Sequence, residues 1–135
     1  MDREQLANVL ERFVKWSCTK PLDEAAFETI VSKDVIVRIP YPGCPPTFDG
    51  LLAITKKSHE AAPDFQIKIQ ETIVDVQQSR VIVLLQVTGT HQGYPFFCLV
   101  VNNISEWLGI PPTGKQFDVL GFIMVKVTLL RRLWI

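Results

Sequence analysis

The sequence has no excess of charge of either sign: Lys and Arg number 14, Asp and Glu number 14, and the formal net charge is zero. This balance argues against a dedicated nucleic-acid-binding protein, which would carry a basic patch or stripe. Charged residues are also few, 21% against 47% hydrophobic residues, and such a composition argues against disorder. The apolar excess predicts either an unusually large core or apolar surface that lines a cavity or an interface.

Metal-binding and targeting motifs are missing as well. Cys18, Cys44 and Cys98 form no CxxC pair and no Cys/His cluster at metal-ligand spacing, so we expect three reduced thiols and no zinc site. No basic segment followed by an apolar one opens the chain, which argues against a signal peptide. The longest apolar stretch, 119–135, contains Lys126 and is too short to span a bilayer. We expect a soluble, cytoplasmic protein without membrane contact.

The length predicts a single domain over residues 1–135, because domains cluster at roughly 100–150 residues. Apolar residues at helical spacing predict three helices, which begin after Asp2 with a capping box to Gln5, at Pro21, and after Asp49. Alternating and β-branched runs predict strands at 35–39, 65–74, 81–91 and 116–130, with an extended or irregular segment at 94–109. Helices followed by antiparallel strands predict an α+β fold, in which the helices cover one face of a curved sheet.

Three short motifs follow one another in the second half of the chain: Pro-Asp-Phe at 63–65, Gly-Thr-His-Gln-Gly at 89–93 and Ile-Pro-Pro-Thr-Gly-Lys at 110–115. Together with the order of the elements, they make residues 5–128 resemble the SnoaL-like polyketide cyclase family of the nuclear transport factor 2 superfamily. The segment between the last two motifs, 94–108, is longer than in ordinary members and rich in aromatic residues. In this it is similar to small isomerases and cyclases of fungal secondary metabolism.

The resemblance implies a cone-shaped α+β barrel: three N-terminal helices packed on a strongly curved antiparallel sheet that encloses a pocket. It implies a cofactor-free isomerase or cyclase that rearranges a small polycyclic natural product of terpenoid, polyketide or alkaloid type. It also implies a homodimer, commonly formed through the outer face of the sheet. The apolar excess would then line the pocket as well as the core. The sequence has no nucleotide-binding loop, nucleophile elbow or metal motif, so we expect no cofactor.

Two histidines and one glutamate are the candidate proton-transfer groups. His91 continues the face of 81–91 that holds Val81, Val83, Leu85, Val87 and Gly89, and the resemblance implies that it lies in the pocket. A histidine there could exchange a proton or hold a substrate carbonyl, or it could simply anchor the turn. His59 shares the apolar face of the third predicted helix, with catalytic and structural interpretations equally open. Glu60 projects away from that face, which favours a solvated charge paired with Lys56 or Lys57 over a catalytic acid.

Two further residues could bind a substrate carbonyl. Arg38 is the only charge in 35–39; its guanidinium could hold a carboxylate or carbonyl in the pocket, or pair with a surface acid. Tyr41 follows in a stiff proline-rich loop, where its hydroxyl could stabilise an oxyanion. In the longer segment, three aromatic residues could cover the substrate or merely pack: Phe96, Phe97 and Trp107.

The last predicted strand departs from the family pattern. Family members often carry a catalytic Asp two residues after a glycine of this strand, but Gly121 is followed at that spacing by Ile123. Asp118 has the opposite parity and should point outward. The chemistry of the classical cyclases is therefore in doubt, and proton transfer falls to the histidines or Glu60. The apolar tail also lacks the turn residues of the usual final hairpin, so we expect the final strand to be missing or atypical.

Two alternatives to the isomerase or cyclase are a dehydratase of the same fold and a non-catalytic binding or dimerisation module. An epoxide hydrolase ranks lower, because it needs an Asp-Arg-Asp set of which only Arg38 is present. A cavity with two or more convergent polar groups would favour an enzyme. A filled or wholly apolar cavity would favour the module.

Overall fold

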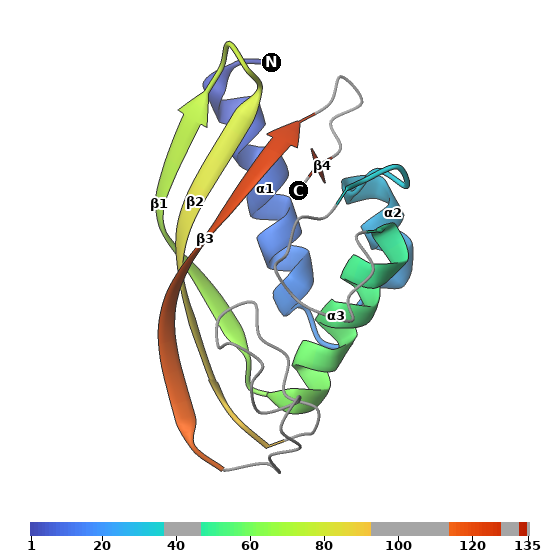
Figure 1. Cartoon of the computed structure of the whole chain (residues 1–135), viewed down its shortest axis with the longest axis vertical. Coiled ribbons are helices and arrows are strands. Elements are labelled where there is room, and N and C mark those ends of the chain that lie inside the picture. Colours follow the sequence, from blue (N-terminus) through green and yellow to red (C-terminus); the bar gives the residue numbers. More distant parts are fainter. Residues whose placement is uncertain (37–46, 93–113, 128–132, 135) are drawn as a thin grey trace.

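A computed structural model of the chain describes residues 1–36, 47–92, 114–127 and 133–134 (Figure 1). Three helices come first: α1 (Arg3–Cys18), α2 (Glu24–Ile30) and α3 (Phe48–Ala61). The strands follow: β1 (Gln66–Asp75), β2 (Arg80–Thr90), β3 (Gln116–Val127) and the two-residue β4 (Leu133–Trp134). The predicted α+β class and the predicted order of the elements are confirmed for this part of the chain.

Side-chain caps set where the helices begin. The Asp2 carboxylate accepts a hydrogen bond of 2.8 Å from the Gln5 backbone, and the Gln5 side chain accepts one of 3.0 Å from the Asp2 backbone, which confirms the predicted capping box. Asp23 caps α2, so this helix begins at Glu24 and the prediction of a helical Pro21 is wrong. The physical reason is that the Asp23 carboxylate satisfies the first-turn N–H of Ala26, which fixes the helix start downstream of the proline.

The strands pair in the order β1-β2-β3-β4, and every pairing is antiparallel. Side chains of β2 alternate strictly: its odd-numbered residues from Val81 to Gly89 are buried and its even-numbered residues are more exposed. The inward residues of β3 lie beside those of β2 in the strand register, as Val125 lies beside Val81. The outward residues of β3 include Asp118 and Phe122. A register shift between Ile69 and Glu71 places a bulge in β1.

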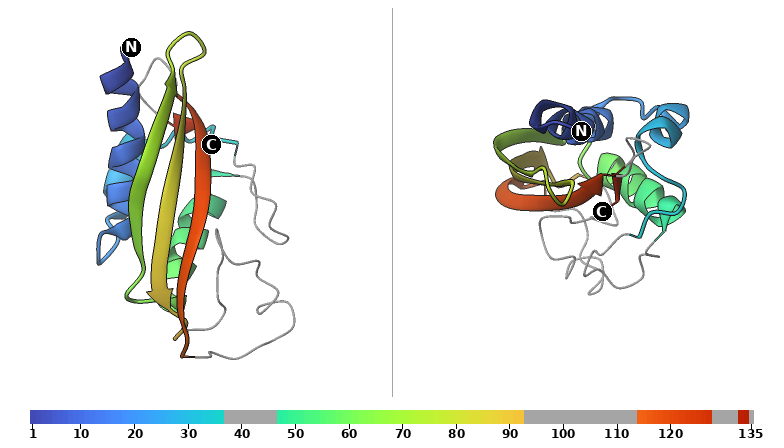
Figure 2. Two further views of the ribbon diagram at one scale, coloured as in Figure 1. Left: turned by 90° about the vertical axis from the view of Figure 1, so that its left-hand side faces the viewer. Right: turned by 90° about the horizontal axis from the view of Figure 1, so that it is seen from above.

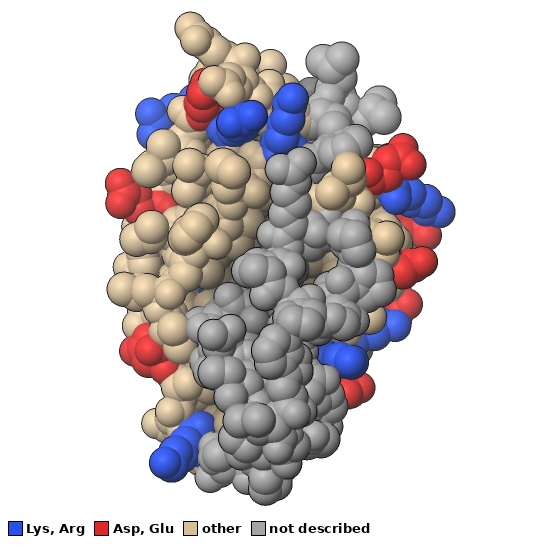
Figure 3. Space-filling view, viewed as in Figure 1, with Lys and Arg blue, Asp and Glu red and all other residues tan. Residues whose placement is uncertain are grey.

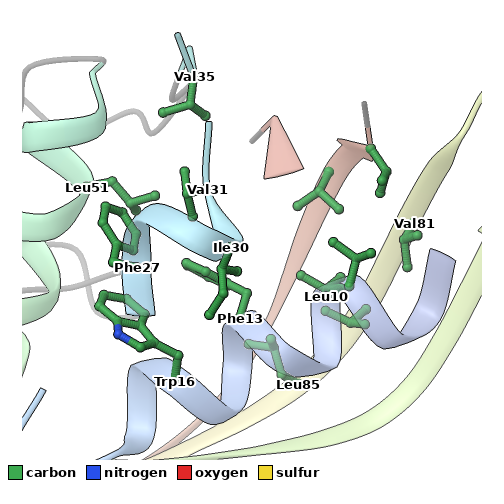
Figure 4. Packing of buried hydrophobic residues seen from close by; sticks show 14 of the residues in the cluster. Leu10, Phe13, Trp16, Phe27, Ile30, Val31, Val35, Leu51, Val81 and Leu85 are labelled. Atoms are coloured by element: carbon green, nitrogen blue, oxygen red, sulfur yellow. The ribbon is translucent and has the colours of Figure 1, made fainter. Parts of the chain in front are cut away.

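The inner face of the sheet packs against the helices (Figure 4). Trp16 of α1 stacks on Phe27 of α2 with ring centroids 4.5 Å apart, and its indole N–H donates a 2.6 Å hydrogen bond to the Asp23 carbonyl. Figure 4 shows Leu10, Phe13 and Ile30 between these rings and the strands. The core therefore consists of one layer of helices packed on one face of a sheet.

All three helices lie on the same side of the sheet, and in Figure 2 (left) no described element covers its other face. The described strands form an open, twisted sheet rather than a closed barrel, so the predicted cone that encloses a pocket is not established by these residues. Val35 and Ile36, where we predicted the start of a strand, lie in neither a helix nor a strand. The reason is local, because the Val35 N–H donates to the Ser32 carbonyl within a turn.

Two predicted segments lie outside the described residues. These are the rest of the strand predicted at 35–39 and the extended or irregular segment predicted at 94–109. The strand predicted at 116–130 is confirmed as far as Val127. Among the described helices none is long and apolar enough to cross a membrane.

Candidate functional site

His91 lies at the far end of the inward row of β2, where the sequence parity placed it. Its side chain is buried, with 7% of its surface exposed. Its backbone N–H donates to the Lys115 carbonyl at 2.9 Å, and its own carbonyl accepts from the Gly114 N–H at 2.8 Å. These bonds attach the residue to the segment that leads into β3. The imidazole is thus held at the end of an apolar inner face, where it could exchange a proton with a bound molecule.

Gly89, two residues before His91, makes room for an aromatic ring. A Cβ at Gly89 would lie only 2.7 Å from the Cζ atom of Phe117 and 3.3 Å from the Cβ atom of Ala62. The ring of Phe117 therefore crosses β2 directly over the glycine, a close approach that only glycine allows. The glycine of the Gly-Thr-His motif thus has a packing role, which the sequence alone does not reveal.

Asp64 connects the Pro-Asp-Phe and Gly-Thr-His motifs. Its carboxylate accepts hydrogen bonds from the Thr90 hydroxyl at 2.7 Å and from the Thr90 backbone N–H at 2.8 Å. The hydroxyl bond is the main reason why the pKa of Asp64 lies below its ordinary value. The Gln92 N–H also donates to the Ala61 carbonyl at 2.9 Å. The end of α3 and the end of β2 are therefore joined on both sides of His91.

His59 joins α3 to α1 through a hydrogen bond. Its Nε2 atom lies 2.6 Å from the backbone carbonyl of Ser17, and its ring centroid lies 6.1 Å from that of Phe65. Since a carbonyl only accepts, Nε2 carries the proton and Nδ1 is the basic nitrogen of the neutral ring. The hydrogen bond to Ser17 therefore supports the structural interpretation of His59. A catalytic role for His59 would have to use Nδ1.

Glu60 lies on the exposed side of α3. One of the two lysines expected to pair with it, Lys56, instead pairs with Glu24 at 2.5 Å. The structure thus separates Glu60 from the inner face on which His91 lies. The remaining predicted site residues lie outside the described residues: Arg38, Tyr41, Phe96, Phe97 and Trp107.

A small apolar pocket opens on the inner face between β1, β2 and β3. Its volume of about 20 Å³ is enough for one water molecule. Gly121 and Ile123 line its β3 side, and the absence of a side chain at Gly121 leaves the space open, since a Cβ there would only touch Leu85 at 3.6 Å. The other residues around it are Phe65, Ile67, Leu85, Val87 and Phe122, the last of which directs its side chain to the outer face. Among the residues of the pocket, the sequence pointed only to Gly121 and Ile123, as the positions around a missing acid. The sequence feature that could have indicated the pocket is a lone glycine in an apolar strand.

Ile123 occupies the position at which the family pattern places an acid, and it faces this pocket. Asp118 lies on the outer face, as its parity predicts, where its carboxylate accepts two hydrogen bonds of 2.8 and 2.9 Å from the Gln86 side-chain amide. No carboxylate borders the pocket, and no group of His, Cys, Asp or Glu able to hold a metal ion occurs within the described ranges. The lining of the pocket is therefore apolar, and His91 is the histidine at the end of the inward row of β2.

Comparison with known proteins identifies one matching family model, described as SnoaL-like polyketide cyclase, over residues 9–128. No curated protein matches the chain. Among solved structures, a protein from Jannaschia sp. CCS1 assigned as a SnoaL-like polyketide cyclase has a TM-score of 0.71 and 16% identity, over 99% of this chain and 88% of its own.

Two similar structures come from Streptomyces. IdmH from Streptomyces antibioticus, assigned as a polyketide cyclase, has a TM-score of 0.70 and 20% identity over 96% of this chain and 89% of its own. AclR from Streptomyces galilaeus, assigned as a hydroxylase, has a TM-score of 0.70 and 16% identity over 98% of this chain and 88% of its own. At these identities the likeness establishes the fold alone.

Proposed function

The chain belongs to the SnoaL-like polyketide cyclase family, and from this premise we propose that it is a cofactor-independent isomerase or cyclase. Its substrate would be a small polycyclic natural product of terpenoid, polyketide or alkaloid type. The observation that carries the proposal is the position of His91, a buried imidazole at the end of an otherwise apolar inner face. Apolar walls would orient the substrate, and the imidazole would move the proton that a skeletal rearrangement requires.

The chemistry expected from these residues differs from that of a cyclase with a carboxylate in β3. Ile123 supplies apolar surface instead of a base, so His91 is the first candidate for proton transfer and His59, through Nδ1, the second. Placement of one such group contributes roughly 10²–10⁴-fold to a rate. Arg38 and Tyr41 would hold a substrate carbonyl in this proposal, and Phe96, Phe97 and Trp107 would cover the substrate.

The experiment incubates the purified protein with a panel of polycyclic ketones and polyketide intermediates and analyses the products by chromatography and mass spectrometry. An isomerisation leaves the mass unchanged, whereas a cyclising condensation or a dehydration removes one water. The variant His91→Gln should lower turnover by at least about 100-fold, because the amide cannot transfer a proton. The double variant His59→Gln, His91→Gln should lose the turnover that remains in the single variant.

His59→Gln alone serves as the matched control. The glutamine amide can still donate to the Ser17 carbonyl, so the contact between α3 and α1 is kept while the titratable ring is removed. Full turnover in the double variant would rule out proton transfer by either histidine.

The specific observation that favours a second function, a non-catalytic binding module, is the wholly apolar lining of the small pocket. In that case the same substrate panel would yield no product. Apolar compounds would instead raise the melting temperature of the protein, because a ligand that binds only the folded state stabilises it.

A further inference from the structure

The last residue of β2 and the two that follow it are held to other segments by their backbone. The Thr90 N–H donates to the Asp64 carboxylate at 2.8 Å, and the Gln92 N–H donates to the Ala61 carbonyl at 2.9 Å. Between them, the His91 N–H donates in the opposite direction, to the segment that leads into β3. The backbone that carries the buried imidazole is therefore fixed from both sides.

The Asp64 side chain continues the pairing of β1 with β2 beyond the first residue of β1. This strand begins at Gln66, which lies opposite Thr88. If the antiparallel ladder continued by two residues, Asp64 would lie opposite Thr90, and a backbone carbonyl would accept from the Thr90 N–H. Instead the Asp64 carboxylate accepts this bond, and it also accepts a bond of 2.7 Å from the Thr90 hydroxyl. One side chain thus extends the ladder to the residue directly before His91.

The backbone around Asp64 is itself held in place. The Lys20 ammonium donates a hydrogen bond to the Pro63 carbonyl, and the Phe65 N–H donates to the Ala62 carbonyl at 2.9 Å. The carboxylate therefore starts from a fixed turn between α3 and β1. Hydrogen bonds to an ionised acceptor are also stronger than those between neutral groups, so this contact can hold a strand end that no backbone carbonyl of β1 reaches.

The two bonds to Thr90 control the direction of the next side chain. Successive side chains of a strand point to opposite faces, so the outward direction of Thr90 and the inward direction of His91 are fixed together. The structure shows this alternation, because His91 is buried and Thr90 is only half-buried. A rotation of the strand end that turned the imidazole away from the inner face would have to break both bonds between Thr90 and Asp64.

We propose that Asp64 is a positioning residue, which directs the His91 imidazole to the inner face through Thr90. The effect on turnover rests on the proposed function, but the position of the ring can be measured without a substrate. Asp64 itself stays away from the inner face: both of its oxygens are bound by Thr90, and it borders a surface hollow together with the outward residues Thr88 and Asp118. Misplacement of a reacting group by about 1 Å can cost about 100-fold in rate.

The geometry disfavours a role in which the negative charge of Asp64 acts directly on His91. The carboxylate oxygens are bound to Thr90, and in the view of Figure 3 the surface over the strands is mostly uncharged, with acidic side chains lying singly. A role through hydrogen-bond geometry should survive loss of the charge, whereas a role through charge should not. Asparagine separates the two, because its amide keeps an acceptor for the Thr90 N–H and offers a donor to the Thr90 hydroxyl.

The first experiment measures kcat and KM with the polycyclic ketone of the panel that the wild type converts fastest. Asp64→Ala should lower kcat at least about tenfold and leave KM within about twofold, because the apolar surfaces that bind the substrate are kept. Asp64→Asn should retain most of the kcat. Asp2→Ala is the matched control and should change neither constant. It also removes a carboxylate that accepts a backbone N–H at 2.8 Å, but the adjoining Met1 lies at the hairpin end of the sheet.

The second experiment observes the His91 imidazole by NMR spectroscopy with no substrate present. The variant His91→Gln assigns the ring signals by their loss. In folded Asp64→Ala these signals should shift or broaden, whereas in Asp64→Asn and Asp2→Ala they should stay close to their wild-type positions. If Asp64 only stabilised the fold, Asp64→Ala would have a lower melting temperature but unmoved ring signals, and that result would overturn the proposal.

The two experiments distinguish a failure of this proposal from a failure of the proposed function. If the wild type converts no compound of the panel, the proposed function fails, and the ring signals alone decide whether Asp64 positions His91. Equal losses of kcat in Asp64→Ala and Asp64→Asn would indicate a role of the charge and would overturn positioning through Thr90. An equal loss in Asp2→Ala would assign the effect to lower stability and would overturn the proposal as well.

Discussion

The two ends of the inner face of this sheet differ in how completely they are packed. At the hairpin end, Val81 and Val125 lie opposite each other with 0% and 1% of their surfaces exposed. Towards the other end, Val119 and Ile67 flank β2 and are only half-buried, although they point to the same side. The sequence pattern is the same at both ends, alternating apolar residues with a period of two. The two ends therefore differ in burial and not in sequence pattern.

The more open end also contains the residues with chemical interest. His91, the small pocket beside Gly121, and the close packing of Phe117 on Gly89 all belong to it. The interior at the hairpin end is filled by buried valines, which stabilise the fold. The comparison separates a fully packed end of the sheet, which stabilises the fold, from an end at which Val119 and Ile67 are only half-buried.

The largest expected effect compares the same substitution at the two ends of β3. Val125→Ala should lower the free energy of unfolding by about 2–3 kcal/mol, because it leaves a cavity in a filled core. Val119→Ala should cost only about 1 kcal/mol, because its side chain is already partly in water. Urea unfolding measures both. Equal losses would contradict the division between the two ends.

Close packing at Gly89 provides the second test. Gly89→Ala should destabilise the protein by about 1–3 kcal/mol, because the new Cβ would lie 2.7 Å from the Phe117 ring and force it to move. The matched control is the double variant Gly89→Ala, Phe117→Leu. The shorter side chain should recover part of the loss relative to Phe117→Leu alone, which thermal unfolding would measure. A wild-type melting temperature in Gly89→Ala would show that this end is looser than the structure indicates.

Much of this picture could be predicted from the sequence, because it depends on local patterns. The capping box at Asp2, the strands of the hairpin, and the opposite orientations of His91 and Asp118 follow from spacing and parity alone. Contacts between distant segments could not be predicted in this way. The bonds of Asp64 to Thr90 and of His59 to Ser17 depend on how elements meet in space, which no periodicity encodes.

The failures of prediction have equally local causes. Pro21 fits the first turn of a helix by its backbone preference, but the Asp23 cap starts the helix later. Val35 has the β-branched side chain typical of strands, yet its N–H is used within a turn. In both cases a single hydrogen bond outweighs a residue preference, which is a weak predictor on its own.

The Asp64 carboxylate, which connects the Pro-Asp-Phe and Gly-Thr-His motifs, should make the stability of the protein depend on pH. Thr90 holds the pKa of Asp64 below its ordinary value, so the folded state favours the ionised form. The resulting stabilisation is complete above the ordinary pKa of about 3.9 and is lost as the pH falls through the lower pKa of the folded state. Asp64→Asn should cost about 1 kcal/mol at neutral pH.

The measurement is urea unfolding from neutral to acidic pH. Across this window the wild type should lose more stability than Asp64→Asn, so the two curves should converge at the acidic end. Thr90→Val is a second control, because it removes the hydroxyl that is the main cause of the shift while leaving the backbone donor. Parallel curves for the wild type and Asp64→Asn would show that the carboxylate is not held by Thr90 in solution.

The smallest expected effect on stability separates packing from function most clearly. Gly121→Ala should stabilise the protein by about 0.4–1 kcal/mol, because alanine restricts the unfolded chain and its Cβ meets only Leu85, at 3.6 Å. The same methyl group enters the small pocket, so it should fill part of its volume while the melting temperature rises. Gly89→Ala would lower stability at the neighbouring end of β2. Opposite signs for one substitution at two glycines would show that close packing requires a glycine at position 89 and does not require one at position 121.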